Sequence, residues 1–293
     1  MKKSERNKKK NHSGRPEAKA AEFQKKIALI NDLSGFGRCS LTVSLPIISA
    51  LKVECAVLPT CILSSHTAYP SFYMKDCTAD MDPWMDEWKK LDLKFEGIYT
   101  GFLGSEEQIE HVVRFINLFK LEKTLLIVDP VMGDHGKIYS TYTDGMCEKM
   151  KELAYRADIL TPNLTEACRL TDSEYREDFS EDELADLGKK LIAMGPSQIV
   201  ITGIERDGKI LNLIFERGKK MKILSSEKIE PSRHGTGDVF ASVLAAKRVQ
   251  GSSFEKSVKS AAKFVRRCLK ISSKLNVPAE EGVAFEELLT ELK

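Results

Sequence analysis

The sequence predicts an α/β protein, a three-layer αβα arrangement with a mostly parallel central sheet and an antiparallel edge. From residue 27 onward, short apolar runs rich in β-branched residues alternate with amphipathic stretches, which is typical of strand–helix–strand units. The apolar runs are continuous, as in strands that helices cover on both faces. After residue 202 two such runs follow closely, with Arg217 and Gly218 between them, which predicts an antiparallel hairpin at one edge.

The parallel strands are expected at six apolar runs: 26–30, 53–58, 97–100, 124–128, 158–160 and 198–202. The helices are expected at the amphipathic stretches 40–51, 82–91, 106–119, 144–155, 181–194, 238–250 and 254–271, and a last amphipathic segment spans 284–292. The edge hairpin is expected at 209–215 and 220–224. Ligands of open α/β sheets bind at the carboxyl ends of the strands, so we expect the chemistry in the loops that follow them.

Charge and composition divide the 293-residue chain into a short tail and one domain. The first 26 residues hold ten basic and three acidic residues, a net charge of +7, which leaves −5 on the remainder. We therefore expect residues 1–25 to be a disordered, solubilising tail and residues 26–293 to form a single domain. The mildly acidic body gives no support to nucleic-acid binding as the main function.

Other features exclude several classes of protein. No apolar run approaches the ~20 residues of a membrane span, and no apolar N-terminal segment suggests a signal peptide, so we expect a cytoplasmic protein. The seven cysteines are an odd number without C-x-x-C spacing, which argues against a disulfide framework or a zinc site.

The strongest functional signal is the segment Gly235-Thr236-Gly237-Asp238 at the start of an expected helix. Glycines let a backbone approach a phosphate closely, and the N–H groups of a first helical turn attract anions. Asp238 could simply cap the helix. We favour a general base that takes a proton from a hydroxyl while the amides hold the phosphoryl group which that hydroxyl attacks.

Two further loops carry acidic and polar residues at strand ends. Asp129 and Asp134 bracket the loop after the run 124–128, and two carboxylates at a strand tip suit Mg²⁺ with bound phosphates. The next loop holds Asn163 and Glu166, whose spacing fits a helix capping box. The same pair could instead hold phosphate or metal-bound water, and the sequence leaves both readings open.

These three loops resemble those of the ribokinase superfamily and, within it, the pyridoxal/pyridoxamine kinases. Two more stretches narrow the resemblance: Ser65-His66-Thr67-Ala68-Tyr69 is similar to the His-Thr-x-Tyr segment of vitamin B6 kinases, and Thr100-Gly101-Phe102-Leu103-Gly104-Ser105 is similar to their Ser/Thr-Gly-Tyr-Leu-Gly-Ser loop. The five motifs occur in the family's order and span about residues 27–271. The resemblance implies a ribokinase-like fold and transfer of the ATP γ-phosphoryl group to the 5′-hydroxymethyl of pyridoxal, pyridoxamine or pyridoxine.

The resemblance also implies roles for individual residues. Asp238 would be the base, and Gly235, Thr236 and Gly237 would form the anion hole. The nucleotide would contact seven residues, of which Asp129 and Glu166 would also act on Mg²⁺: Asp129, Asp134, Tyr139, Thr161, Asn163, Glu166 and Thr202. The acceptor would contact Asp32, Thr60, His66 and Phe102. A homodimer is expected, and whether a monovalent cation such as K⁺ is used stays open.

Asp32 and Phe102 depart from the pattern of the B6 kinases. Asp32 replaces a usual serine and could pair with a protonated ring nitrogen or amine, and Phe102 replaces a tyrosine, so the preferred vitamer stays open. For His66, a purely structural role in its loop is an equal alternative.

Three alternative functions are weaker. The segment 31–40 looks like a dinucleotide-binding loop, but Ser40 replaces its third glycine and no acid ends the second strand. The hydroxymethylpyrimidine kinases of the thiamin pathway share much of the pattern, but they usually carry Cys at the position of Asp238 and lack the His-Thr-x-Tyr stretch. If the chain were a non-catalytic vitamin- or sugar-binding protein, we would expect it to have lost the base or the glycines, and both are present.

Overall fold

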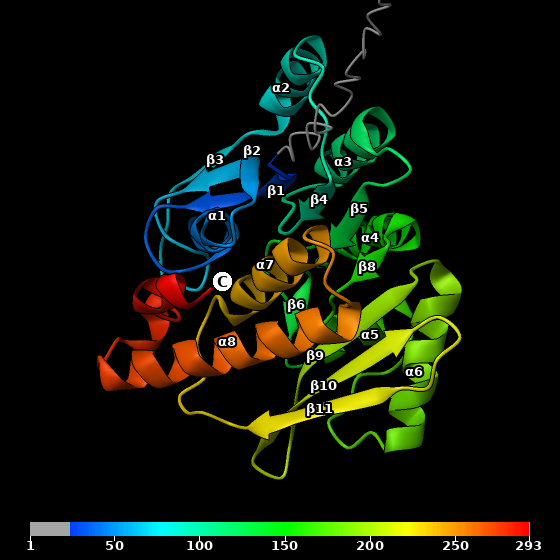
Figure 1. Cartoon of the computed structure of the whole chain (residues 1–293), viewed down its shortest axis with the longest axis vertical. Helices are drawn as coiled ribbons and strands as arrows, with labels where there is room; N and C mark the ends of the chain where they lie inside the picture. Colours follow the sequence, from blue (N-terminus) through cyan, green and yellow to red (C-terminus); the bar gives the residue numbers. More distant parts are fainter. Residues whose placement is uncertain (1–23, 293) are drawn as a thin grey trace, which may run out of the picture.

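A nine-stranded mixed sheet forms the centre of the computed structural model, which describes residues 24–292 (Figure 1). The strand order is β11-β10-β9-β8-β5-β4-β1-β2-β3. The six inner strands from β9 to β2 are mutually parallel, whereas β10 and β11 at one edge and β3 at the other pair antiparallel. The predicted α/β fold, its parallel strands and its antiparallel edge hairpin are therefore confirmed.

The elements have the following bounds. The strands of the sheet are β1 Lys26–Ser34, β2 Glu54–Leu63, β3 Met74–Asp76, β4 Gly97–Thr100, β5 Leu125–Val128, β8 Ile159–Leu160, β9 Gln198–Arg206, β10 Lys209–Glu216 and β11 Lys222–Glu227, and β6 Gly133–Asp134 and β7 Lys137–Ile138 form a separate small hairpin. The helices are α1 Ser40–Ala50, α2 Thr78–Lys90, α3 Glu106–Phe119, α4 Asp144–Arg156, α5 Leu164–Leu170, α6 Glu181–Met194, α7 Thr236–Val249 and α8 Phe254–Lys274, followed by the 3₁₀ turns η1 Ala279–Glu281 and η2 Glu286–Glu291.

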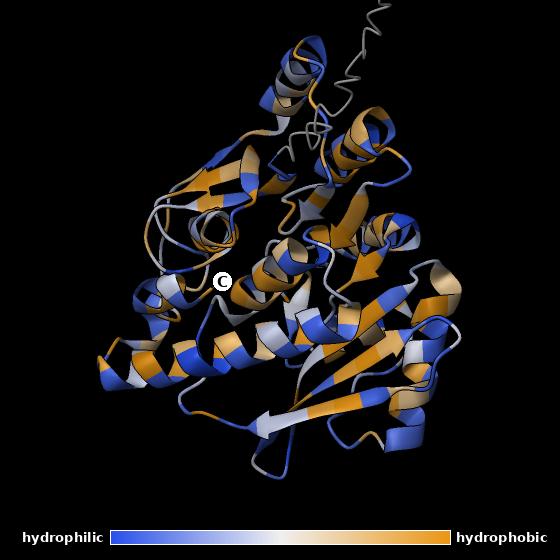
Figure 2. Cartoon of the chain, viewed as in Figure 1, coloured by the Kyte–Doolittle hydropathy of each residue, from blue (hydrophilic) through white to orange (hydrophobic). Residues whose placement is uncertain are grey.

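Helices cover both faces of the sheet, so the predicted three layers are present. Alternate residues of each strand enter different cores: Leu126 and Val128 pack with α2–α6, and Ile127 between them packs with α1, α7 and α8. All three side chains are fully buried, which explains why the strand reads as a continuous apolar run. Figure 2 shows the same division, with apolar central strands and helices that carry both apolar and polar residues.

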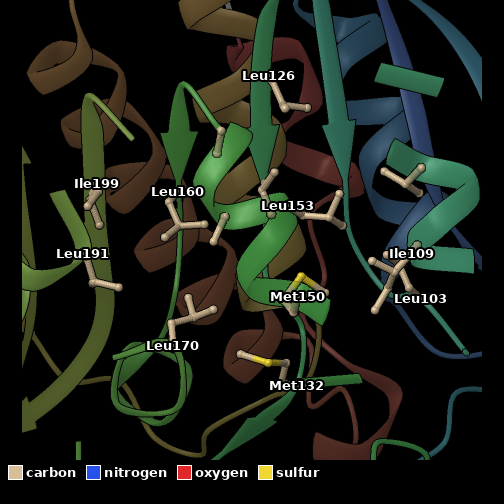
Figure 3. Close-up of a cluster of buried hydrophobic side chains, with 14 of the residues drawn as sticks. Leu103, Ile109, Leu126, Met132, Met150, Leu153, Leu160, Leu170, Leu191 and Ile199 are labelled. Atoms are coloured by element: carbon tan, nitrogen blue, oxygen red, sulfur yellow. The ribbon is translucent and has the colours of Figure 1, made fainter. Parts of the chain in front are cut away.

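The larger core joins three adjacent strands to the helices beside them (Figure 3). Leu126 of β5, Leu160 of β8 and Ile199 of β9 meet Leu153 of α4 and Leu191 of α6 there. All five side chains are 0% exposed, and truncating one of them to alanine costs about 2–5 kcal/mol in a packed core. This packing fixes the strand ends from which the loops of the site emerge.

Several features differ from the sequence prediction. Strand β3 and the β6–β7 hairpin were not expected, because two or three residues carry no readable period. Helix α2 begins at Thr78, since Asp76 accepts a hydrogen bond from the Thr78 N–H over 2.8 Å and starts the helix four residues early. The amphipathic segment at 284–292, for which no type of helix was predicted, contains the 3₁₀ turn η2.

The predicted disordered tail, residues 1–25, lies outside the described residues except for Gln24 and Lys25, and it stays a prediction, as does the single domain. Among residues 24–292, no helix combines the length and the apolar composition that crossing a membrane requires.

Candidate active site

A cavity of about 580 Å³ lies at the carboxyl ends of the parallel strands. Residues from β1 and β9, from the loops after β1, β2, β4, β5 and β8 and from the start of α7 line it. Every site residue predicted from the sequence lines this cavity except Thr60: Asp32, His66, Phe102, Asp129, Asp134, Tyr139, Thr161, Asn163, Glu166, Thr202, Gly235, Thr236, Gly237 and Asp238. Segments up to 206 residues apart in the chain therefore meet at one place.

The N-terminus of α7 lines the cavity, and its two glycines, Gly235 and Gly237, differ in whether a side chain would fit there. Gly235 is the N-cap residue in the left-handed region, with φ 78°, and a Cβ there would collide with the carbonyl oxygen of Arg38. Gly237 lies within the helix, and nothing is found within 4 Å of a Cβ built on it. Gly235 has no side chain to cap the first-turn N–H groups, so they remain available to an anion.

Asp238 lies in the first turn of α7, and the groups around its carboxyl shift its pKa in opposite directions. Burial is the largest cause of a pKa raised to about 7 for its carboxyl; the nearby charge of Asp32 also raises the pKa, whereas the Ser40 N–H and the Asn31 amide lower it. The side chain still keeps partial access to the cavity. A carboxylate with a pKa near neutrality is suited to accept a proton from an alcohol.

Ser40 interacts with both Asp238 and Asp32. It adopts a left-handed backbone conformation, φ 52°. A hydrogen bond from its N–H lowers the pKa of Asp238, and a hydrogen bond from its side chain lowers the pKa of Asp32. Asp32 also accepts a hydrogen bond from Ser34 Oγ over 3.0 Å. Burial raises the pKa of Asp32, and these hydroxyl groups oppose that shift. A non-glycine residue at positive φ is uncommon, and here it aims a backbone donor at the candidate base.

Asp129 and Glu166 form an acidic pair in the middle of the cavity. Thr161 Oγ1 donates to Asp129 Oδ1 over 3.0 Å, and the two oxygens of Glu166 accept from the backbone N–H groups of Met132 (3.1 Å) and Asn163 (2.8 Å). Burial raises the pKa of both carboxyls, and repulsion from neighbouring carboxylates adds to it. A cation or a proton is therefore favoured here.

The capping box predicted for Asn163 is present. Asn163 Oδ1 accepts from the Glu166 N–H over 2.9 Å, and its Nδ2 donates to the carbonyl oxygen of Gly133 over 2.7 Å. The structural role exists together with the position at the cavity, so the two readings of this pair are compatible.

The remaining residues expected at the nucleotide lie at the rim of the cavity. Asp134 is exposed on the β6–β7 hairpin, and Tyr139 follows that hairpin with 42% of its surface exposed. The Tyr139 N–H donates to the carbonyl oxygen of Met132 over 2.9 Å, which holds the hairpin over the cavity. Thr202 pairs with Asn163 through a parallel bridge between β9 and the start of α5.

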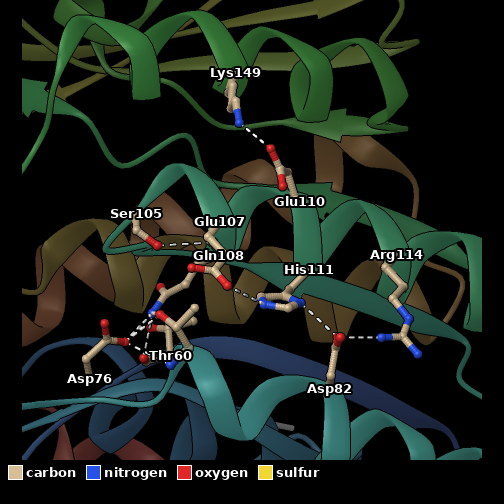
Figure 4. Close-up of polar contacts among 11 residues, drawn as sticks. Thr60, Asp76, Asp82, Ser105, Glu107, Gln108, Glu110, His111, Arg114 and Lys149 are labelled. Carbon is tan, nitrogen blue, oxygen red and sulfur yellow. Dashed lines mark hydrogen bonds and ion pairs between the residues drawn. The ribbon is translucent and has the colours of Figure 1, made fainter.

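Thr60, expected to contact the acceptor, lies behind the cavity wall. It is 0% exposed, and its Oγ1 donates to the carbonyl oxygen of Phe102 over 3.0 Å. Gln108 of α3 supports the same loop, since its Nε2 donates to the carbonyl oxygen of Thr60 over 2.9 Å (Figure 4). Its Oε1 accepts from the Gly104 N–H over 2.7 Å. Thr60 thus acts on the cavity through the backbone of Phe102.

His66 is 7% exposed, and the protein occupies both of its ring nitrogens. Nδ1 accepts from the Ala68 N–H over 3.3 Å, and Nε2 lies 2.8 Å from the carbonyl oxygen of Glu280. These contacts fit a neutral ring with its proton on Nε2. The ring also covers Gly37, where a Cβ would collide with it.

A C-terminal segment holds these loops together. The Arg38 N–H donates to the carbonyl oxygen of Glu281 over 3.1 Å, and the Val283 N–H donates to that of His234 over 3.1 Å. Arg38 also pairs with Glu286 at 2.6 Å. The loop after β1 and the loop before α7 are therefore fixed by residues near the end of the chain.

Sequence reasoning missed two parts of the site. Asn31 lines the cavity beside Asp32, and the register of β1 with β2 shifts by one residue between Asn31 and Leu33. Such irregularities re-aim side chains near active sites and leave no sequence signal. The other part is the end of the cavity lined by β10, α7 and α8: Ile210, Asn212, Phe240, Ala262, Val265 and Leu269. Its α8 residues read only as one face of an amphipathic helix.

Similar proteins divide between two kinds of kinase. The family model of phosphomethylpyrimidine kinase matches residues 85–283. A pyridoxine/pyridoxal/pyridoxamine kinase of Bordetella avium is 28% identical over 250 residues, which cover 80% of this chain and 81% of that protein. A hydroxymethylpyrimidine/phosphomethylpyrimidine kinase of Bacillus subtilis is 32% identical over 181 residues, 61% of this chain and 65% of that protein.

A solved structure from Bacteroides thetaiotaomicron, described as a candidate phosphomethylpyrimidine kinase in a crystal form with pyridoxal, is similar over nearly the whole fold. It is 36% identical, with a TM-score of 0.87, and the match covers 92% of this chain and 96% of that one.

Proposed function

This chain belongs to the phosphomethylpyrimidine kinase family of the ribokinase superfamily, and we propose that it transfers the γ-phosphoryl group of ATP to the 5′-hydroxymethyl of a B6 vitamer. The observation that carries the proposal is the position of Asp238. Its carboxylate stands at the open N-terminus of α7, next to the unoccupied space above Gly237. A base and an anion hole side by side are what transfer of a phosphoryl group to an alcohol requires.

The proposed reaction is a single in-line transfer. Asp238 takes the proton of the acceptor hydroxyl while the oxygen of that hydroxyl forms a bond to the γ-phosphorus. The bond from the γ-phosphorus to its bridging oxygen breaks, and the electron pair leaves with ADP. The N–H groups at Gly235, Thr236 and Gly237 hold the phosphoryl oxygens during the transfer, and the dipole of α7 favours their negative charge.

The acidic pair Asp129 and Glu166 fits Mg²⁺, with Asp134 nearby at the rim. Mg²⁺ commonly takes one or two carboxylates and completes its shell with phosphates and water. Within residues 24–292 no group of three or more His, Cys, Asp or Glu side chains could hold a metal ion by itself, so phosphates would complete this site. When bound, the ion would supply charge neutralisation to the transferring phosphates. Use of K⁺ in addition remains an open expectation.

The nucleotide is proposed to extend from Asp129 toward α8. Thr161, Asn163 and Thr202 lie beside the phosphates, and Tyr139 covers them from the rim. The apolar end formed by Phe240, Ala262, Val265 and Leu269 suits a nucleobase, and Asn212 adds one amide there. Apolar walls with few polar groups are typical of cofactor and nucleotide pockets.

The acceptor is proposed to bind between Asp32, His66 and Phe102. Asp32 favours an acceptor whose pyridine carries a positive charge, because a buried carboxylate is stabilised by a cationic partner. Protonated ring nitrogens and the amine of pyridoxamine both meet this requirement. Asp238 at the position where the hydroxymethylpyrimidine kinases usually carry Cys favours a B6 vitamer over hydroxymethylpyrimidine, which is the second candidate.

The decisive experiment measures ADP release with Mg-ATP and each of four acceptors in turn: pyridoxal, pyridoxamine, pyridoxine and hydroxymethylpyrimidine. We expect turnover with at least one B6 vitamer, with kcat/KM above that for hydroxymethylpyrimidine. The opposite order would assign the chain to the thiamin pathway. Tight acceptor binding without ADP release would instead favour a non-catalytic binding protein.

A homodimer is the expected assembly. Large apolar side chains are exposed together near the β3 edge of the sheet: Leu33, Phe36, Ile62, Phe72, Tyr73 and Met74. Apolar patches of this kind often mark protein interfaces. Light scattering of the purified chain would give the mass of a dimer if this expectation holds.

A further inference from the structure

The side-chain amide of Asn31 is held in one orientation, and its NH₂ group is unpaired. Asn31 Oδ1 accepts two backbone hydrogen bonds, from the Phe102 N–H over 2.8 Å and from the Asp32 N–H over 3.0 Å. The donors fix which end of the amide is oxygen and which is nitrogen. Asn31 is 3% exposed, and in the part of the chain that the structure describes its Nδ2 has no hydrogen-bond partner.

The unpaired nitrogen belongs to a residue in the wall of the active-site cavity. Asn31 lines that cavity together with Asp32 and Asp238. It lies close enough to Asp238 to act on its carboxylate, although the two make no hydrogen bond of ordinary geometry. Gly101 leaves the room for this placement, because a Cβ there would overlap the Asn31 amide.

An unpaired buried amide is expensive for the folded protein. Leaving a buried donor unsatisfied forfeits the hydrogen bonds that it makes to water in the unfolded chain, so most such groups in folded proteins find partners. Two backbone donors and one glycine nevertheless hold Nδ2 in this position. A bound ligand that accepts a hydrogen bond would remove the cost.

We propose that Asn31 is a catalytic residue whose Nδ2 donates a hydrogen bond to the acceptor hydroxyl oxygen while Asp238 accepts the proton of that hydroxyl. The inference rests on the proposed function, because it needs an alcohol at the reacting centre. A donor on Asn31 and an acceptor on Asp238 can both be satisfied only by a group that accepts one hydrogen bond and donates another. An alcohol both accepts and donates, whereas an aldehyde oxygen only accepts and an ammonium group only donates.

The pair therefore selects which substituent of the ring reacts. A pyridine bound with its aldehyde or its amine at this position would leave Asp238 or Asn31 unpaired. A site that requires a hydroxyl rejects groups that cannot satisfy it, because its own buried groups then lose their partners. Asn31 thus contributes to the choice of the hydroxymethyl as the phosphorylated group.

The test compares binding of a hydroxyl-bearing acceptor, such as pyridoxine, with its analogue that carries a methyl group in place of the 5′-hydroxymethyl. Calorimetry measures both affinities without turnover. In the unaltered protein we expect the hydroxyl to strengthen binding about tenfold, as one hydrogen bond would. In Asn31→Asp, which keeps an oxygen for the Phe102 and Asp32 N–H groups but loses the donor, this factor should fall below about threefold.

Gly101→Ala is the second variant, and it should reduce the same factor because its methyl group displaces the amide. Gln108→Glu is the matched control: it alters another buried amide, one whose Nε2 donates to three partners, and it should lower the melting temperature but keep the factor. If the hydroxyl strengthens binding by the same factor in the unaltered protein, in Asn31→Asp and in Gly101→Ala, the inference is overturned.

The outcomes separate this inference from the proposed function. If the unaltered protein releases ADP with a B6 vitamer but the factor does not depend on Asn31, only the role of Asn31 is wrong. If the unaltered protein neither phosphorylates any acceptor nor distinguishes the two ligands, the proposed function itself is wrong, and the role of Asn31 is overturned with it.

Discussion

The ring of His66 and the backbone of Glu280, 214 positions apart in the chain, are joined by a hydrogen bond of 2.8 Å. The second ring nitrogen accepts from the Ala68 N–H. His66 therefore has no free nitrogen for a substrate, and the structural alternative for this residue is the one that its contacts support. The bond ties the loop after β2 to the turn η1 near the end of the chain.

A His66→Ala variant tests this role. Losing a buried side chain and two hydrogen bonds should lower the melting temperature by several degrees. The kcat/KM values for pyridoxal, pyridoxamine and pyridoxine should fall by similar factors, because the change loosens the whole loop. A selective loss for one vitamer would instead show that the imidazole contacts the acceptor directly.

Alanine substitutions of the two glycines before Asp238 should have different effects, one on stability and the other on activity. Gly235→Ala should destabilise the protein, since φ 78° disfavours alanine and the new methyl group meets the Arg38 carbonyl. Gly237→Ala should leave the melting temperature unchanged or slightly higher, because the residue is helical and its Cβ enters open space. Its methyl group should nevertheless lower kcat/KM for ATP about tenfold or more, by occupying the space proposed for the phosphate.

Equal thermal stability of the two variants, measured by calorimetry, would contradict the backbone argument. Full activity of Gly237→Ala would contradict the location of the anion hole.

Asp238→Asn separates activity from stability. Loss of the general base should reduce kcat by roughly a hundredfold or more, while ATP binding stays close to that of the unaltered protein. The folded protein should become more stable at pH 8, by about 2–4 °C in melting temperature, because a buried charge has been removed. Unchanged turnover in this variant would refute the assignment of the base.

The pH profile follows from the raised pKa of Asp238, about 7. A base acts only when it has lost its proton, so kcat/KM for the acceptor should fall about tenfold per pH unit below pH 7 and level off above it. Stability should change in the opposite direction. Between about pH 4 and 7 the folded state holds a proton that the unfolded chain has lost, so stability falls as the pH rises through this window.

Calorimetry from pH 5 to 8 checks the sign of this change. Asp238→Asn should show a weaker dependence than the unaltered protein over the same range.

Asp32→Ser tests the charge at the acceptor. The variant should change the ratio of kcat/KM among the vitamers, with pyridoxamine losing most, because it carries the additional amine charge. The KM for ATP should change little, since Asp32 belongs to β1, whereas the residues proposed to hold the nucleobase belong to β10, α7 and α8. Equal losses for all vitamers in steady-state assays would argue against a role in selectivity.

The sequence was a good guide where period and position carry information. The run before Asp129 is apolar throughout because Leu126, Ile127 and Val128 are buried from both sides, and that pattern predicted both the strand and its functional end. The role proposed for Asn31 could not be predicted, because it depends on a hydrogen bond from the Phe102 N–H, 71 residues away in the chain, and on the space that Gly101 leaves. For Thr60, the resemblance implied a ligand contact, but its hydroxyl is buried against the backbone of Phe102.

The contacts of residues 280–283 with the loops at Arg38, His66 and His234 have a consequence for how the protein is made. Synthesis on the ribosome proceeds from the N-terminus, so both glycine-containing loops emerge before the segment that fastens them. The nascent chain can form its sheet first, and the two loops are fastened only after residues 280–283 have left the ribosome. The proposed active site would therefore be completed abruptly, when that segment docks, rather than gradually with chain length.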